Sequence, residues 1–92
     1  MKILVTGVAG FIGFNLANFL LKKNNYVYGI DNFDKYYSIK IKKRRVSILK
    51  KNKNFFFDKV DIVNKKKLNF FFKEKKIDII VHLAAQAGVR YS

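Results

Sequence analysis

Three glycines spaced three residues apart constrain this chain more than any other feature of its sequence. Gly7, Gly10 and Gly13 follow the apolar run KILVT and lie within VTGVAGFIGFNLA, a stretch that otherwise favours a helix. A glycine in a helix interior costs roughly 1 kcal/mol relative to alanine, so a helix across all three would be weakened. The glycines therefore predict a tight turn that joins a strand to a helix and lets a ligand approach the backbone closely.

Strand and helix signals alternate along the 92 residues. Residues 2–6, 24–31, 54–61 and 77–85 have the apolar, β-branched or aromatic character of strands, and residues 11–23, 39–51 and 64–76 have helical patterns. In the first helix, the apolar positions at helical spacing are Phe11, Phe14, Leu16, Phe19 and Leu20. The order β-α-β-α-β-α-β predicts an α/β fold, in which right-handed crossovers place helices on both faces of a parallel sheet.

Length and composition set limits on the class of protein. Ninety-two residues are fewer than the roughly 100 to 150 of a common domain, which is consistent with a fragment. The chain has no cysteine, so we expect no disulfide and no thiolate metal site, and a cytoplasmic location fits best. No apolar run approaches the roughly 18 residues of a membrane span, so we expect no membrane partner.

The formal net charge of +14 has two explanations. A strongly basic domain is typical of proteins that bind nucleic acid, with steep salt dependence. Lysine is, however, spread over every segment and accompanies Asn, Ile, Phe and Tyr, whose codons are all A/T-rich, while Pro and Trp are missing. We therefore favour compositional drift, with the lysines on solvent-exposed helix faces and ends and no specific nucleic-acid partner.

The glycine-rich turn predicts a dinucleotide-binding site. Gly7 is expected to permit the turn, Gly10 to let N–H groups near the helix N-terminus reach a pyrophosphate, and Gly13 to bring helix and strand together. Asp31 ends the second strand eighteen residues after Gly13, where a carboxylate accepts hydrogen bonds from an adenosine ribose. A role for Asp31 as a simple turn former at the strand end stays open.

Three segments resemble a known family. VTGVAGFIGFNLA, GIDN and VHLAAQAGVRYS are similar to the cofactor loop, the ribose-binding strand end and the segment after the fourth strand of extended short-chain dehydrogenase/reductases that act on nucleotide sugars. The resemblance covers the whole chain. It implies the N-terminal part of a Rossmann-type NAD-binding domain over residues 1–92, with strand order 3-2-1-4. Within the family, DNFDKYYS and HLAAQAGVRYS look most like UDP-glucuronate 4-epimerases, which implies NAD-dependent epimerisation of a UDP-sugar by a cytoplasmic, homodimeric full-length enzyme.

The resemblance also implies roles for individual residues. The pyrophosphate of NAD would lie along the glycine turn, the adenosine ribose at the end of the second strand, the adenine after the third strand and the nicotinamide half after the fourth. The implied cofactor-binding residues, in that order, are Gly7, Gly10, Phe11, Ile12 and Gly13, then Asp31 and Asn32, then Asp61 and Ile62, then Ala84, Ala85 and Ala87. For Asp61 an N-cap or turn role stays open, and for the alanines ordinary tight packing does.

Few residues of this sequence are candidates for substrate binding or catalysis. Arg90 offers paired donors suited to a substrate carboxylate, with a solvated loop charge as the alternative. Tyr36 and Lys40 have the Y-x-x-x-K spacing of the family's catalytic pair, but they directly follow the adenosine-binding strand, whereas the family's pair lies after a fifth strand. We therefore expect no catalytic residue and no metal ligand here, and the catalytic groups beyond Ser92. A related dehydratase or reductase, or an inactive split-gene remnant, remains an alternative.

The remaining conspicuous side chains are expected to be structural. His82 lies in the fourth predicted strand, where a hydrogen-bonded core histidine is the expected role. The phenylalanine triplets at 55–57 and 70–72 are expected to fill the core rather than to stack on nucleic-acid bases, and only one side of each triplet can face that core.

Overall fold

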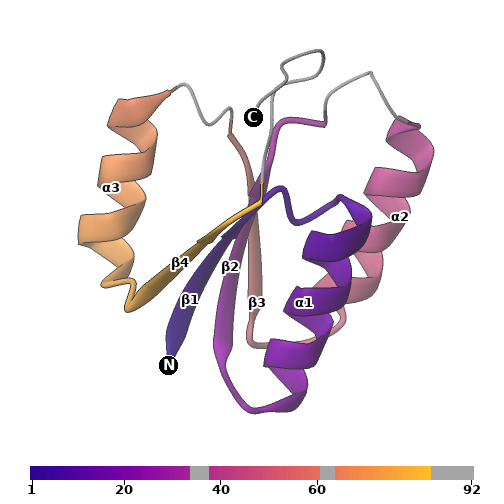
Figure 1. The fold of residues 1–92 in the computed structure, drawn as a ribbon, viewed down its shortest axis with the longest axis horizontal. Helices are drawn as coiled ribbons and strands as arrows, with labels where there is room; N and C mark the ends of the chain where they lie inside the picture. The colour runs from indigo at the N-terminus through magenta and orange to yellow at the C-terminus, as the bar shows by residue number, and fades with distance from the viewer. Residues whose placement is uncertain (34–37, 61–63, 84–92) are drawn as a thin grey trace.

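The computed structural model describes residues 1–33, 38–60 and 64–83. Within these ranges the chain alternates strands and helices, as the sequence predicts (Figure 1). The elements are β1 (Lys2–Thr6), α1 (Phe11–Lys22), β2 (Tyr26–Asp31), α2 (Ile39–Lys50), β3 (Phe55–Lys59), α3 (Lys65–Lys75) and β4 (Ile79–His82). The predicted order β-α-β-α-β-α-β is confirmed.

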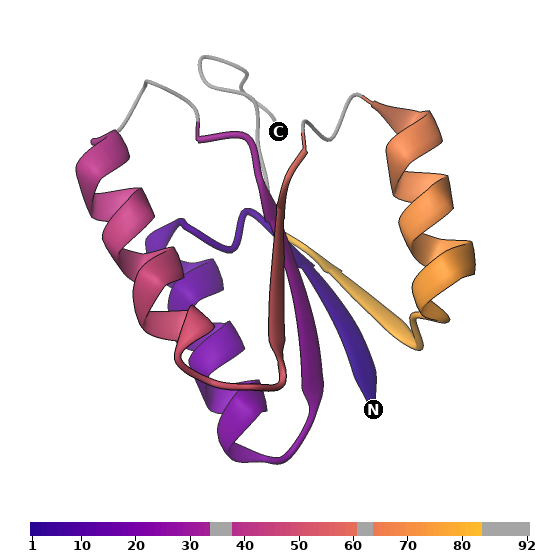
Figure 2. The ribbon, with the colours of Figure 1, turned by 180° about the vertical axis from the view of Figure 1, so that it is seen from behind.

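The four strands form one sheet in the order β3-β2-β1-β4, and every neighbouring pair is parallel. The α/β fold and the strand order 3-2-1-4 are therefore confirmed. Helices α1 and α2 cover one face of the sheet and α3 lies on the other, which the two opposite views show (Figures 1 and 2). Right-handed crossovers produce this arrangement when the chain adds strands first on one side of β1 (β2 and β3) and then on the other side (β4).

Alternate residues of the strands build two apolar layers. On one face of the sheet, side chains of β1, β2 and β3 pack against α1 and α2. The strand residues are Ile3, Val5, Val27 and Phe55, and the helix residues are Ala17 and Leu21 of α1 with Val46 and Leu49 of α2. The intervening residues pack on the other side with Leu68 of α3 and form the second cluster, Leu4, Tyr28, Ile30, Val60 and Ile77. Successive side chains of a strand point to opposite faces, so both faces of the central strands are buried and their sequences read as continuous apolar runs.

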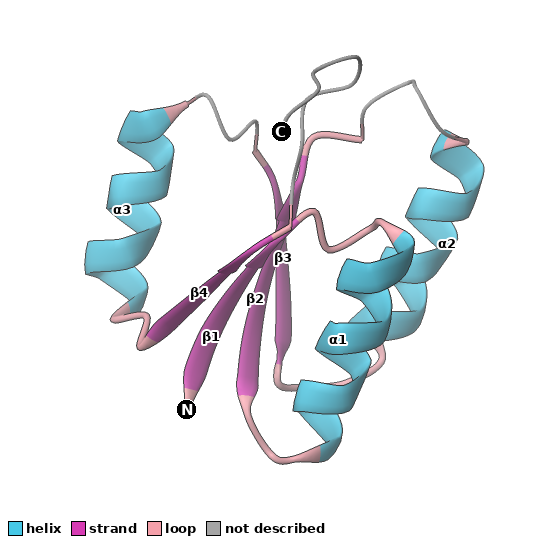
Figure 3. Cartoon of the chain, in the orientation of Figure 1, coloured by secondary structure: helices cyan, strands magenta, loops and turns pink. Residues whose placement is uncertain are grey.

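Helix α1 forms where the sequence predicts it (Figure 3), but its fully buried residues include none of the five apolar positions noted in the sequence. The buried residues are Gly13, Ala17 and Leu21, whereas Phe11 and Phe19 are 70% and 55% exposed. A displacement of two residues turns a side chain about 200° around a helix, so the two phenylalanines lie opposite the buried stripe. Two of the three residues on that stripe are small, Gly13 and Ala17, which lets the helix approach the sheet closely.

One expectation for a single side chain needs correction. His82 is exposed and not part of the core, because β4 is an edge strand in the described sheet; its Nδ1 lies 3.0 Å from the Thr6 hydroxyl.

The phenylalanine triplet of β3 has one side toward the core, as expected. Phe55 is buried and Phe57 is half-buried against the same cluster. Phe56, which lies between them, is 45% exposed and stacks on Tyr28 of the neighbouring strand, with ring centroids 4.9 Å apart. In the triplet of α3, Phe70 is 59% exposed, and the side chains of residues 71 and 72 lie outside the described part of the chain.

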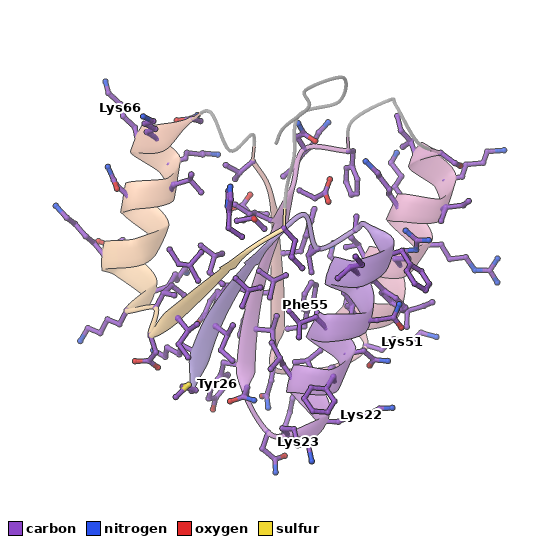
Figure 4. The ribbon with its side chains drawn as sticks, in the orientation of Figure 1. Lys22, Lys23, Tyr26, Lys51, Phe55 and Lys66 are labelled. Carbon is purple, nitrogen blue, oxygen red and sulfur yellow. The ribbon has the colours of Figure 1, made fainter. Side chains whose placement is uncertain are left out.

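The absence of a side chain at Gly29 lets the turn after β1 pack against β3. A Cβ atom at this buried position of β2 would lie 2.7 Å from Val8 Cγ1 and 2.9 Å from two ring atoms of Phe55. Phe55 points between the sheet and α1 (Figure 4). The ring of Phe55 therefore fills the space that any other residue at position 29 would occupy.

We expect Gly29→Ala to lower the free energy of unfolding by about 1 to 3 kcal/mol, the usual cost of overpacking a core. Urea unfolding of the chain, followed by circular dichroism, measures the change. Ser47→Ala, on the exposed side of α2, is the control and should stay within about 0.5 kcal/mol of the wild type. Equal stability of Gly29→Ala and Ser47→Ala would contradict this account of Gly29.

Candidate functional site

A cleft of about 500 Å³ lies at the carboxyl ends of the strands. It is bounded by the turn after β1, the first turn of α1, one face of α2 and the residue that follows β4. The residues that line it are Gly7, Gly10, Phe11, Ile12, Gly13, Ser38, Ile41, Lys42, Arg45 and Leu83. The strand order reverses between β1 and β4, and in open α/β sheets ligands bind outside the carboxyl ends of the strands at such a point.

Two glycines shape the wall of this cleft. Gly7 has φ = 71°, a left-handed conformation that residues with a Cβ adopt only at a cost. Gly13 lies against the backbone of the turn: a Cβ atom there would clash with the Gly7 carbonyl oxygen and would come within 3.0 Å of Gly7 C and Val8 Cα. The expected roles of these two glycines are thus visible in the geometry, although Gly13 brings α1 against the turn rather than against the strand itself.

The backbone donors of the turn are already used inside the protein. Gly7 and Val8 donate to the Ile30 carbonyl at 2.9 and 3.2 Å, and Gly10 donates to the Gly7 carbonyl at 3.0 Å. The next three N–H groups belong to the first turn of α1, where no intrahelical acceptor exists. These are the N–H groups of Phe11, Ile12 and Gly13, all three of which line the cleft.

Asp31 is buried, and its carboxylate holds the turn in place. Its Oδ2 accepts the Ala9 N–H at 3.0 Å and its Oδ1 accepts the Phe33 N–H at 2.8 Å. Asp31 is only 7% exposed, so this charge lies beside the turn and away from bulk solvent. The bond to Phe33, two residues on, is the turn-forming role that stayed open for Asp31, whereas the bond to Ala9, which supports the glycine turn, was not predicted.

Two cationic residues of the site were not predicted from the sequence. Lys42 and Arg45 of α2 line the cleft, and Lys42 is only 7% exposed, so the expectation of solvent-facing lysines is wrong at this position. It holds for Lys22, Lys51 and Lys66, which are exposed and point outward from helix surfaces and ends (Figure 4).

A signal for this face of α2 was present in the sequence. The cleft-lining residues of this segment are spaced i, i+3, i+4 and i+7, which places them on one side of a helix. They are Ser38, Ile41, Lys42 and Arg45. Ser38 also caps the helix, because its hydroxyl accepts the Ile41 N–H at 3.3 Å. Sequence alone does not say that this side faces the glycine turn.

Thr6 of β1 contacts the end of β4 beside the cleft, which Leu83 lines. The Thr6 hydroxyl accepts the Leu83 N–H at 2.9 Å and lies 3.0 Å from His82 Nδ1. Thr6 is almost fully buried, directly before Gly7. These contacts hold the end of β4 beside the glycine turn.

The structure places only part of the predicted site. Asn32 is half-buried next to Asp31, and Lys40 lies exposed on α2. Tyr36 of the Y-x-x-x-K spacing lies outside the described residues. So do the other predicted site positions, Asp61, Ile62, Ala84, Ala85, Ala87 and Arg90. Their roles stay predictions.

Two features are missing from residues 1–33, 38–60 and 64–83. No helix in these ranges is long and apolar enough to cross a membrane. No group of three or more His, Cys, Asp or Glu side chains there is arranged to hold a metal ion.

The parallel sheet, its strand order and the glycine turn at the reversal point define a Rossmann-type fold, the class of domain that binds dinucleotides. Comparison with known proteins identifies the family. The chain belongs to the family described as GDP-mannose 4,6-dehydratase, whose model matches residues 4–92.

Individual relatives are described as epimerases and dehydratases, and two of the similar solved structures contain NAD. The UDP-glucuronate 4-epimerase of Thermodesulfobacterium geofontis is 47% identical over 89 residues, which are 97% of this chain and 28% of the relative. The crystal structure of the Bacillus cereus UDP-glucuronic acid 4-epimerase with UDP-glucuronic acid and NAD has a TM-score of 0.82 and 42% identity, covering 98% of this chain and 28% of that one. A Bacillus anthracis dTDP-glucose 4,6-dehydratase with NAD has a TM-score of 0.81 and 30% identity, covering 95% and 27%. The chain thus spans little more than a quarter of these relatives' length.

The left-handed conformation at Gly7 leads to a prediction for stability. Gly7→Ala should lower the free energy of unfolding by about 1 to 2 kcal/mol, because a Cβ atom disfavours this region of φ and ψ. Gly7→Asn should lose less, since asparagine tolerates the left-handed conformation better than alanine does. Urea unfolding of both variants tests this ranking, and an alanine variant as stable as the asparagine variant would contradict it.

Proposed function

We propose that residues 1–92 form the NAD-binding part of a nucleotide-sugar epimerase that acts on UDP-glucuronate. The observation that carries the proposal is the chemistry of the cleft. The first-turn N–H groups of α1 and the cationic side chains of Lys42 and Arg45 line one space, which suits a diphosphate. The identities of 42% and 47% to UDP-glucuronate 4-epimerases support the choice of substrate.

The residues of the cleft fit a dinucleotide. Close approach of a ligand requires a wall with few side chains. Gly7 and Gly10 supply it, while Gly13 lets the first turn of α1 lie against the glycine turn. The apolar side chains of Ile12 and Leu83 add surface for the uncharged parts of the ligand. Such a mixture of apolar surface and a few polar groups is common in cofactor sites.

Each remaining cofactor residue is proposed for one part of NAD. Asp31 and Asn32 would accept hydrogen bonds from the adenosine ribose, and Asp31 has acceptor capacity beyond its two backbone donors. Asp61 and Ile62 would contact the adenine. The small side chains of residues 84, 85 and 87, all alanine, would let the nicotinamide half pass the end of β4.

The proposed reaction inverts the configuration at C4 of the sugar. The NAD held in this cleft would supply the hydride acceptor for oxidation at C4 and the hydride donor for the return step, and would not be consumed. This chain's part is to bind and orient the cofactor, and Arg90 is proposed to hold the substrate carboxylate through paired N–H donors. We propose no residue of this chain as the base that removes the sugar hydroxyl proton, and we propose that the full-length protein is a cytoplasmic homodimer.

A related nucleotide-sugar dehydratase is the second candidate. The 30% identity and TM-score of 0.81 to a dTDP-glucose 4,6-dehydratase favour it over more distant chemistry. Both enzymes would use the same cofactor cleft, so the two candidates differ only in the product they form. An inactive remnant would form no product at all.

Cofactor choice depends on Asp31 in this proposal. The carboxylate would repel a 2′-phosphate, so NAD should bind more tightly than NADP. Asp31→Asn should weaken NAD binding by about 1.5 to 3 kcal/mol and narrow the preference over NADP, because hydrogen bonds to a charged group are lost. Isothermal titration calorimetry measures both affinities, with Asp58→Asn, an exposed carboxylate of β3, as the control for charge. NADP binding as tight as NAD binding by the wild type would contradict the ribose assignment.

A chimera tests the substrate. Residues 1–92 would replace the matching segment of the Bacillus cereus UDP-glucuronic acid 4-epimerase, which this chain covers to 28%. We expect the chimera to interconvert UDP-glucuronate and its C4 epimer, as measured by chromatography of the products. Arg90→Ala in the chimera should lose turnover and keep NAD binding. A chimera that loads NAD but forms a dehydrated product, or no product, would overturn the epimerase proposal.

A further inference from the structure

Arg45 contacts the glycine turn from outside. Its Nη1 donates to the Ala9 carbonyl oxygen at 3.0 Å, and its guanidinium carbon lies 5.8 Å from the centre of the Phe11 ring. Arg45 comes from α2, 36 residues along the chain from Ala9. The contact therefore joins the second helix to the start of the first.

Ala9 is held from both sides by opposite charges. The Asp31 carboxylate accepts its N–H at 3.0 Å, and the Arg45 guanidinium donates to its carbonyl at 3.0 Å. The first contact fixes the peptide unit before Ala9, and the second fixes the peptide unit after it. Both backbone rotations of this residue are thereby restrained.

The peptide unit between Ala9 and Gly10 can rotate more easily than its neighbours. Gly10, the N-cap of α1 with φ = −72°, has no side chain to limit that rotation. A rotated peptide would move the carbonyl dipole at the entrance to the first turn of α1, where N–H groups must stay free of competing carbonyls to bind an anion. A charged donor such as Arg45 holds a carbonyl more strongly than a neutral one does.

We infer that Arg45 is a positioning residue for dinucleotide binding: by holding the Ala9 carbonyl, it keeps the first-turn N–H groups of α1 oriented toward the diphosphate. This inference rests on the proposed function. It predicts that the binding affinity for ligands with a diphosphate depends on Arg45. The affinity for adenosine, which lacks phosphate, should not depend on it.

The test compares Arg45→Ala with Arg44→Ala. The second variant removes the same charge from an exposed position one residue away, so it controls for the overall electrostatic field. Affinities for NAD, ADP-ribose and adenosine are measured by calorimetry and ligand-observed NMR, in the 92-residue chain and in the chimera. Arg45→Lys retains a charged donor and serves as the conservative variant, while circular dichroism checks that each variant is folded.

We expect Arg45→Ala to weaken binding of NAD and ADP-ribose about tenfold, as loss of a hydrogen bond to a charged group does, and to leave adenosine binding unchanged. Arg44→Ala should match the wild type, and Arg45→Lys should recover most of the loss. Equal affinities of Arg45→Ala and wild type for NAD would overturn the inference, as would an equal loss for adenosine, which would indicate a general structural role. A wild type that binds no NAD in either setting would instead overturn the proposed function.

Discussion

The close approach of α1 to the turn after β1 is the constraint on which the rest of this structure depends. At Gly13 there is no room for a Cβ atom, because the Gly7 carbonyl oxygen and the Val8 backbone occupy that space. This contact fixes where the first turn of α1 lies, and with it the N–H groups that line the cleft. A larger residue would push the helix away from the sheet, and the cleft would lose its wall.

Opposite charges then stabilise the turn that this contact creates. Asp31 at the end of β2 and Arg45 on α2 hold the two sides of Ala9, so residues from three separate segments meet at one position. Asp31 belongs to the same strand as Gly29, where a missing side chain admits Val8 and Phe55. The site is thus an extension of the core that packs α1 and α2 on the sheet, and a change in that packing would change the cleft.

The basic residues that give the chain its net charge of +14 differ in their surroundings. Most lysines of the described helices are exposed, where solvent screens them and their contribution to stability is small. Lys42 and Arg45 instead line the cleft, and Lys42 is only 7% exposed, so that its charge is less screened by solvent. A basic composition by itself therefore says little about the ligand, whereas two cations beside a helix N-terminus favour a diphosphate.

The sequence by itself determined the α/β class, the element order and the position of the glycine turn with Gly7, Gly10 and Gly13. These follow from local patterns: apolar runs of strand length, helical spacing, and glycines where the backbone must turn or be approached. The strand order, and the places of Phe11 and Ile12 beside the glycines, were implied by the resemblance to extended short-chain dehydrogenase/reductases. All five of these residues line the cleft.

Only the tertiary structure decided which side of each helix faces the sheet and which distant residues meet. The sequence pointed to the aromatic residues of α1, yet the close approach at Gly13 selected the small residues and left Phe11 and Phe19 exposed. It likewise gave no reason to separate Lys42 and Arg45 from the other basic residues of α2. Their role depends on where α2 crosses α1, and that is set by the packing of both helices on the sheet, which no local pattern records.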